Sequence, residues 1–303
     1  MVSESAYAKP FVKWAGGKSQ ILNEIRMAYP SDLGYRINKY AEPFIGGGAV
    51  LFDVLGYYEI EEVYISDINR ELIHTYISIR DNVDELIENL KDLEQGYLPL
   101  CDNERKAVYY HNRELYNSLT AANDTSCMLA ALFIFLNRTC FNGLYRVNAK
   151  GSYNVPQGSY KNPCICDEEN LIAVSKKLQN ASIVFGDYQL SRDFIDDRTF
   201  AYFDPPYRPL SSTSSFTAYS QNGFDDRAQT ELAQFIDEMS ERGAYVLATL
   251  TDRNHHDEAS IKIDKLYEKH KVSDTCVNRV VNSKKGWQAT SVKMIYSDGV
   301  HND

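Results

Sequence analysis

The chain has 303 residues, of which 44% are hydrophobic and 24% are charged, as in an ordinary globular protein with one large or two smaller domains. Its longest apolar run, from Met128 to Leu136, is far shorter than the ~20 residues that cross a bilayer. The net charge of −10, taken over the whole chain, argues against a nucleic-acid partner, because phosphate contacts need Lys and Arg.

The amino terminus and the cysteines point to a cytoplasmic protein. Residues 1–5 lack the basic-then-apolar pattern of a signal peptide. Six cysteines are too few for a disulfide scaffold in a chain of this length. The Cys164-Ile165-Cys166 segment has no second pair and no histidines at zinc spacing, so we expect free thiols and no metal site.

Two glycine-rich segments near the start of the chain each precede a helical pattern. Residues 11–18 read Phe-Val-Lys-Trp-Ala-Gly-Gly-Lys, and an amphipathic helix is predicted from Ser19 to Met27. Glycines before a helix let backbone N–H groups approach an anion, and the alternative is a simple turn that caps the helix. Residues 40–50 contain a strand end, three glycines and a helix start, which resembles the nucleotide-binding turn of doubly wound folds without the dinucleotide spacing.

An acidic residue ends the next predicted strand, which covers residues 63–66. Asp67 lies 25 positions after Glu42 (67 − 42), close to the ~20-residue interval at which such folds place a ribose-binding carboxylate. Together with the glycine turn, this spacing indicates an adenosine-type cofactor.

A helical block with no clear strand signal follows, from Asn69 to Asn137. Apolar residues recur mostly at intervals of three and four in the segments 71–80, 83–93, 105–119 and 126–136. Placed between strands of a parallel sheet, this block is typical of an inserted domain. The alternative is a set of helices that pack within the main domain.

The segment from Thr125 to Cys166 has no Asp or Glu, although the chain as a whole is acidic. An acid-free, basic and aromatic segment indicates an anionic partner at one face, and the alternative is a core of aromatic residues with ordinary surface cations. Asn142-Gly143 followed by alternating side chains predicts a hairpin or looped arm. The cations are Arg138, Arg146, Lys150 and Lys161, and the aromatic residues include Phe133, Phe135, Phe141, Tyr145, Tyr153 and Tyr160.

The sheet resumes with a strand over 182–186 that ends at Asp187, and then with a buried strand over 200–203. The prolines of Asp204-Pro205-Pro206-Tyr207 end ladder pairing, which leaves an acceptor-rich corner at the carboxyl end of that strand. The Asp204 carboxylate, the Pro205 carbonyl and the Tyr207 ring suit a planar amino-aromatic group. The alternative is a proline turn with a surface acid.

The remainder of the chain completes an α/β pattern. A helix is predicted over 226–242, a strand over 244–250, and an antiparallel edge hairpin from the segments 275–281 and 291–296.

These segments together resemble the D12 class, or Dam-like, DNA adenine methyltransferases, which use S-adenosylmethionine. One four-residue match would be weak evidence, but eight matches in the family's order span nearly the whole chain. The resemblance implies a Rossmann-like methyltransferase sheet, residues 1–68 and 167–303, with an inserted, mainly helical DNA-recognition domain, residues 69–166. The matching segments are 13–18, 42–48, 67–69, 137–146, 151–160, 186–188, 204–207 and 216–219.

The resemblance also implies roles for individual residues. Asp204, Pro205 and Tyr207 are expected to hold the target base, with Asp204 also beside the cofactor. The residues implied in cofactor binding are Trp14, Lys18, Glu42, Phe44, Gly46 and Gly48 for the methionine part, Asp67 for the ribose, and Asp187 and Tyr188 for the adenine. The residues implied in DNA binding are Lys13, Arg138, Phe141 as a wedge, Asn142 on phosphate, and Leu144, Arg146 and Pro156 on bases.

The resemblance implies methylation of adenine N6 in double-stranded DNA. It favours GATC, because Leu144 and Arg146 match the reading loop of GATC enzymes, although relatives with longer sites share much of this loop. No metal and no membrane is expected. The enzyme is either an orphan regulator or the partner of a cognate restriction endonuclease that acts on the same site without direct contact. Two departures from the family stand out: Phe141 replaces the commoner tyrosine, and the segment 292–295 lacks an acid. The alternatives are methylation of RNA or of a glutamine side chain, or a DNA-binding relic without turnover.

Overall fold

The computed structural model describes residues 7–206, 224–252, 265–282 and 286–297. The chain forms two compact units, each assembled from segments that are distant in sequence. The first unit comprises Met1–Gly17, Gly46–Tyr57 and Asp67–Gly186, and the second comprises Lys18–Ile45, Tyr58–Ser66 and Asp187–Asp303.

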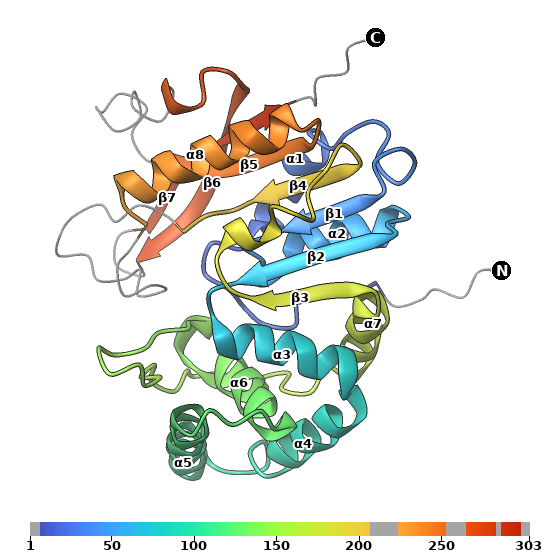
Figure 1. Ribbon diagram of the computed structural model, residues 1–303. Coiled ribbons are helices and arrows are strands. Elements are labelled where there is room, and N and C mark those ends of the chain that lie inside the picture. Colours follow the sequence, from blue (N-terminus) through green and yellow to red (C-terminus); the bar gives the residue numbers. More distant parts are fainter. Residues whose placement is uncertain (1–6, 207–223, 253–264, 283–285, 298–303) are drawn as a thin grey trace. The chain divides into compact units, whose positions relative to one another are not determined.

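A mixed sheet of seven strands is the main β-structure of the described chain, and six of the strands lie in the second unit in the order β2-β1-β4-β5-β7-β6. The first four of these are parallel, and β7 runs antiparallel to both β5 and β6 (Figure 1). The predicted edge hairpin is therefore confirmed. The strand bounds are β1 Lys39–Glu42, β2 Glu62–Asp67, β4 Thr199–Phe203, β5 Tyr245–Asp252, β6 Lys271–Asn282 and β7 Gly286–Ser297.

The strand β4 is apolar along its length because both of its faces are covered. All five of its residues are buried, as expected for a strand in the middle of a parallel sheet. Its neighbours are β1 and β5, and the strand order reverses between β1 and β4. The carboxyl ends of strands at such a reversal are where open α/β sheets bind ligands, and these ends carry Glu42 and Asp204.

Helices of the second unit follow their local sequence signals. The helix α8, Asp226–Glu241, begins at Asp225, whose carboxylate accepts a hydrogen bond of 2.8 Å from the amide of Ala228. The helix predicted over 19–27 is split into a 3₁₀ turn, Lys18–Gln20, and the short helix α1, Leu22–Arg26. Ile21 separates them because its backbone (φ −118°, ψ 18°) lies outside the helical region.

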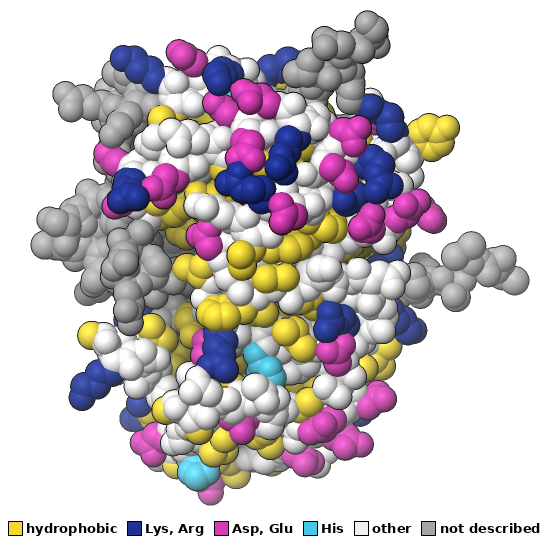
Figure 2. All heavy atoms as spheres, viewed as in Figure 1, with side chains coloured by type: hydrophobic (Ala, Val, Ile, Leu, Met, Phe, Trp, Pro, Cys, Tyr) yellow, Lys and Arg dark blue, Asp and Glu magenta, His cyan; other side chains and the backbone are white. Residues whose placement is uncertain are grey.

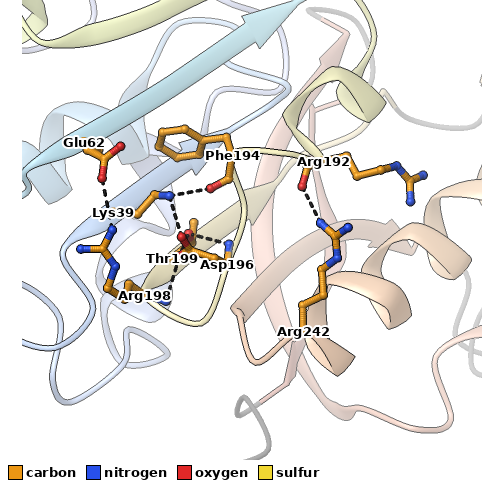
Figure 3. Close-up of polar contacts among 8 residues, drawn as sticks. All are labelled: Lys39, Glu62, Arg192, Phe194, Asp196, Arg198, Thr199 and Arg242. Carbon is orange, nitrogen blue, oxygen red and sulfur yellow. Dashed lines mark hydrogen bonds and ion pairs between the residues drawn. The ribbon is translucent and has the colours of Figure 1, made fainter.

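A polar network holds the amino-terminal ends of β1 and β4 (Figure 3). The buried Lys39 ammonium donates hydrogen bonds of 2.8 Å to the Phe194 carbonyl and to Asp196, and it lies 4.4 Å from the centre of the Phe194 ring. Burial raises the pKa of Asp196, but hydrogen bonds from Lys39, the Arg198 amide and Thr199 outweigh it, so the net shift is downward. This network lies at the amino-terminal ends of the two strands, and Asp204 follows the carboxyl end of β4.

The first unit is mainly helical, and the four helices predicted between residues 71 and 136 are confirmed. Its central helix, α6, has an unbroken buried stretch from Leu129 to Leu136, so it is covered on all sides. The expected insertion, residues 69–166, lies wholly within this unit, and its status as a separate domain stays a prediction. The elements are α2 Ala49–Tyr57, α3 Arg70–Asp81, α4 Val83–Gln95, α5 Asp102–Ala121, α6 Cys127–Thr139, α7 Glu168–Leu178 and β3 Ala181–Phe185.

The looped arm is also present, but its tight turn is not where the sequence suggested. The bridge between Val147 and Tyr153 closes a hairpin around Asn148, whose side chain accepts bonds from the amides of Lys150 and Ser152. The predicted Asn142-Gly143 pair instead lies in a 3₁₀ turn, Phe141–Gly143. Both members of that pair have positive φ, which Asn and Gly tolerate best.

The surface carries charges of both signs. On the face in Figure 2, Lys and Arg side chains are interspersed with Asp and Glu rather than gathered into one basic field. Within the described ranges, no helix is long and apolar enough to span a membrane, and no cluster of His, Cys, Asp and Glu could hold a metal ion. The five cysteines described there are free thiols.

Candidate active site

The corner after β4 places the Asp204 carboxylate between a buried cation and a buried hydroxyl. The Lys18 ammonium, whose side chain is 3% exposed, forms an ion pair with Oδ2 of Asp204. The Thr249 hydroxyl on β5 donates to Oδ1 over 3.2 Å. Pro205, the next residue in the chain, is buried, and Tyr207 lies outside the described residues.

A second group of candidates follows β1 in the same unit. Glu42 is buried and accepts a hydrogen bond of 2.7 Å from the Tyr40 hydroxyl. Burial, and then the charge of Glu42, raise the pKa of Tyr40 well above its usual value, so this hydroxyl remains a donor. The Phe44 ring stacks on Tyr188 with ring centres 5.5 Å apart, and Asp187 caps the turn before Tyr188 by accepting from the Gln189 amide. The unit thus offers an acid and an aromatic pair at the end of β1.

The glycine turn belongs to the first unit and is shaped by Trp14 and Asp67. Gly46 has φ 46°, and a Cβ atom there would lie 2.6 Å from Cδ1 of the Trp14 indole. The Gly46 amide donates to Oδ2 of Asp67 over 3.1 Å, and the Tyr76 hydroxyl donates to the Gly46 carbonyl over the same distance. Gly48 also has positive φ, 73°. Both positions favour glycine, because φ is positive and an added Cβ would collide with a neighbouring side chain.

The pKa of the Asp67 carboxyl is raised towards neutral pH. Burial raises its pKa to about 6, although hydrogen bonds from the amides of Asn69, Gly46 and Ile68 favour the ionised form. One oxygen accepts from Asn69 over 2.8 Å and the other accepts from Gly46. Each carboxylate oxygen has two acceptor positions, so the group can bind a ligand hydroxyl in addition.

Every DNA-binding candidate of the sequence lies in the first unit, and a buried amide joins two of the segments that carry them. The Asn137 side chain accepts from the Lys13 amide and donates to the Lys13 carbonyl, both over 2.8 Å, and it donates to the Gly143 carbonyl over 3.1 Å. The segment of Lys13 is thereby tied to the turn that carries Phe141 and Asn142. Arg138 donates to the Phe11 carbonyl over 2.8 Å, which adds a second tie.

Hydrogen bonds within the arm tie its segments together. Phe141 is 51% exposed, and its amide donates to the Pro156 carbonyl over 2.8 Å. The Leu144 carbonyl accepts from the hydroxyl of Tyr153 over 3.1 Å. Nε of Arg146 donates to the side-chain oxygen of Asn154 over 2.7 Å, which orients the guanidinium. An exposed aromatic ring can fill a gap in a base stack, and a guanidinium held by a side-chain hydrogen bond can donate to a base edge.

Side chains of α5 anchor this arm through its backbone. The Tyr109 hydroxyl donates to the Val155 carbonyl over 2.8 Å. The Asn117 amide makes a pair of hydrogen bonds with the backbone of Tyr153, donating to its carbonyl and accepting from its N–H. The two anchoring residues are eight positions apart on one face of the helix.

The sequence did not identify several residues that complete these groups. Thr249 and Tyr202, which hold Asp204, and Tyr145, which stacks on Trp14 with ring centres 5.7 Å apart, were given no role in the site. The two-residue spacing of Tyr202 and Asp204 was the available signal for Tyr202, because residues two apart in an extended chain point to the same face. The expected motif at 216–219 lies outside the described residues.

Comparisons with known proteins identify the family of the chain. Residues 14–280 match the family model of D12 class N6 adenine-specific DNA methyltransferases. The chain is 45% identical over 283 residues to a protein named Type II methyltransferase M.MjaIII from Methanocaldococcus jannaschii, covering 91% of this chain and 93% of that protein. It is 32% identical over 294 residues to the DNA adenine methylase of Escherichia coli K12, covering 96% of each.

Proposed function

This chain belongs to the D12 class N6 adenine-specific DNA methyltransferases, and from that premise we propose that it transfers a methyl group from S-adenosylmethionine to a flipped adenine in GATC. The observation that carries the proposal is the corner at Asp204, where both oxygens of the carboxylate are held by buried partners. The GATC sequence is supported by the match of Leu144 and Arg146 to the reading loop of GATC enzymes.

The residues present suit S-adenosylmethionine. The glycine turn packs against Trp14 and Asp67, and Asp67 supplies acceptors for ribose hydroxyls. When bound, this cofactor supplies a methyl group activated by a sulfonium. We assign the methionine part to Trp14, Lys18, Glu42, Phe44, Gly46 and Gly48, the ribose to Asp67, and the adenine to Asp187 and Tyr188.

We assign to the chain the activation of the adenine amino group, which is a weak nucleophile. The lone pair of the adenine amino group is delocalised into the ring. The Asp204 carboxylate and the Pro205 carbonyl would accept its two hydrogens, which draws the nitrogen towards tetrahedral geometry and places negative charge beside the positive charge that develops. Tyr207 would stack on the base. Alignment then supplies most of the remaining acceleration.

The target atom is inaccessible inside a duplex, so the base must leave the stack at a cost of a few kcal/mol. The exposed ring of Phe141 would fill the gap, and Asn142 and Arg138 would contact the backbone of the DNA. Lys13, Leu144, Arg146 and Pro156 would read bases, with Arg146 donating to a guanine. These residues occupy one arm and one segment joined by Asn137, which supports a common role.

Two further proposals concern a partner enzyme and the division into domains. The Methanocaldococcus protein and a 35% identical protein from Lactococcus lactis are both named Type II methyltransferases, so we propose a cognate restriction endonuclease that acts on the same site in the cytoplasm. We also propose that residues 69–166 form an inserted recognition domain in a catalytic domain of residues 1–68 and 167–303.

A methyl-transfer assay tests the proposal. The purified chain with radiolabelled S-adenosylmethionine is expected to label the adenine of a GATC duplex, but not a duplex with one base of the site changed, an RNA or a protein. Asp204→Ala should abolish labelling while cofactor binding is retained, and Asp193→Ala, at an exposed acid of the same unit, serves as the matched control. Label on RNA or protein alone, or turnover by Asp204→Ala, would refute the assignment.

A further inference from the structure

The buried hydroxyl groups of Tyr202 and Thr249 form a chain of hydrogen bonds that ends at the Asp204 carboxylate. β4 and β5 are parallel, with Phe203 opposite Ala248, so the next residues along each strand, Asp204 and Thr249, are neighbours. The Thr249 hydroxyl lies 3.2 Å from Oδ1 of Asp204 and 2.8 Å from the hydroxyl of Tyr202. Thr249 is 0% exposed and Tyr202 is 1% exposed, so both hydroxyl groups are shielded from water.

The direction of both hydrogen bonds follows from the chemistry of the groups. An ionised carboxylate only accepts, so Thr249 must use its one hydroxyl hydrogen on Asp204. The Thr249 oxygen then accepts the hydrogen of Tyr202. The resulting relay runs from Tyr202 through Thr249 to Oδ1, and each bond in such a chain polarises and strengthens the next.

Both oxygens of the carboxylate are therefore held, Oδ1 by Thr249 and Oδ2 by Lys18. The last torsion of an aspartate is broad when the group is unrestrained, so an unheld carboxylate presents its lone pairs in many orientations. We propose that Thr249 and Tyr202 are positioning residues that fix the rotation of the Asp204 carboxylate, and with it the acceptor that takes a hydrogen of the substrate amino group. This inference rests on the catalytic role proposed for Asp204.

If Thr249 only packed against its neighbours, its hydroxyl group would not be needed. A fully buried strand residue that only packs is served as well by valine, which has the same shape and a high strand propensity. A buried hydroxyl is costly to desolvate unless it is hydrogen-bonded, and Thr249 is bonded on both sides. The hydroxyl groups, rather than the shape of the side chain, are therefore the feature to be tested.

The test compares four variants with the wild-type chain on a GATC duplex under single-turnover conditions. Thr249→Val keeps the shape and removes the hydroxyl, and Thr249→Ser keeps the hydroxyl. Tyr202→Phe removes the first donor, and the double variant Tyr202→Phe/Thr249→Val removes both. Dissociation constants for S-adenosylmethionine and for the duplex, and the melting temperature, are measured for each.

We expect Thr249→Val to lower the single-turnover rate ~10- to 100-fold, as for a misplaced reacting group, with both dissociation constants unchanged. Thr249→Ser should react close to the wild-type rate. Tyr202→Phe should lose less than Thr249→Val, and the double variant should be no slower than Thr249→Val alone, because the relay acts as one unit. If Thr249→Val does not fold, Tyr202→Phe and Thr249→Ser still decide the question.

A wild-type rate in Thr249→Val, or in Tyr202→Phe should Thr249→Val not fold, would overturn the inference while leaving the proposed function intact. A serine variant as slow as the valine variant would overturn it as well, because the hydroxyl would not then be the cause. A rate loss accompanied by an equal loss of duplex or cofactor affinity would also count against positioning. A wild-type chain that does not methylate DNA at all would instead refute the proposed function.

Discussion

Protonation of Asp67 is expected to weaken cofactor binding in mildly acidic solution. Burial raises the pKa of this carboxyl to about 6. The ionised form accepts the hydrogen bond of the Gly46 amide and, as proposed, those of the ribose hydroxyls, so a proton competes with the cofactor. Affinity is therefore present above pH 6 and is lost as the pH falls through this value.

The size of the effect follows from the pKa. A group with a pKa of about 6 is about 90% ionised at pH 7 and about 10% ionised at pH 5, so affinity should fall roughly tenfold, or about 1.4 kcal/mol, between them. The effect on folding has the opposite sign. Because the folded pKa lies above the unfolded value of about 3.9, protonation of Asp67 stabilises the fold as the pH falls from about 6 to 4. A loss of binding from this group is therefore not a loss of structure.

Calorimetric titration with S-adenosylmethionine between about pH 5 and pH 8 measures this dependence. Asp67→Asn should bind weakly at every pH and show no slope, because the amide does not titrate in this range. Asp84→Asn, at an exposed acid of the same unit, should keep the wild-type slope. The reasoning fails if the wild-type affinity is constant over this range, or if Asp67→Asn retains the slope.

Three further substitutions test other parts of the structure. Gly46→Ala should lower the free energy of unfolding in urea by ~1–3 kcal/mol, because φ is 46° and the new Cβ would lie 2.6 Å from the Trp14 ring; an unchanged value would show that the ring moves aside. Arg146→Ala should cost ~1–3 kcal/mol of discrimination on duplexes changed at one base, and an unchanged preference would assign base reading to another residue. Lys39→Met removes hydrogen bonds to Phe194 and Asp196 and should lower the free energy of unfolding by ~1–3 kcal/mol. The methylation rate of the folded enzyme should be unchanged, because these residues lie at the other end of the strands from Asp204. A lower rate with cofactor and DNA both saturating would show that this network affects the reaction.

The elements of the fold could be predicted from the sequence because their signals are local. An apolar run followed by Asp204-Pro205-Pro206 must end a strand, since proline cannot donate to the ladder. The helices α3 to α6 of the first unit were recovered within a few residues, because an apolar stripe at intervals of three and four is typical of a helix, whereas α7 was not predicted. The acid at the end of β2 could likewise be assigned from its spacing to the glycine turn.

Some turns depend on the rest of the chain. Asn142-Gly143 has the composition of a hairpin turn, yet the tight turn forms around Asn148. The competing interaction is the Asn137 amide, which holds the Gly143 carbonyl together with both backbone groups of Lys13, 124 positions before Asn137 in the chain. No local pattern contains that contact.

The sequence by itself determined which groups could do the chemistry, since the acceptors at residues 204–205, the glycine turn and the acid at residue 67 depend on residue types and short spacings. Only the tertiary structure decided how the Asp204 carboxylate is held. Lys18 and Thr249 lie 186 and 45 positions from Asp204, and they meet it because of the pairing of β4 with β5 and the course of the chain. The physical reason is that backbone turns depend on neighbouring residues, whereas the orientation of a buried carboxylate depends on the side chains that surround it in space.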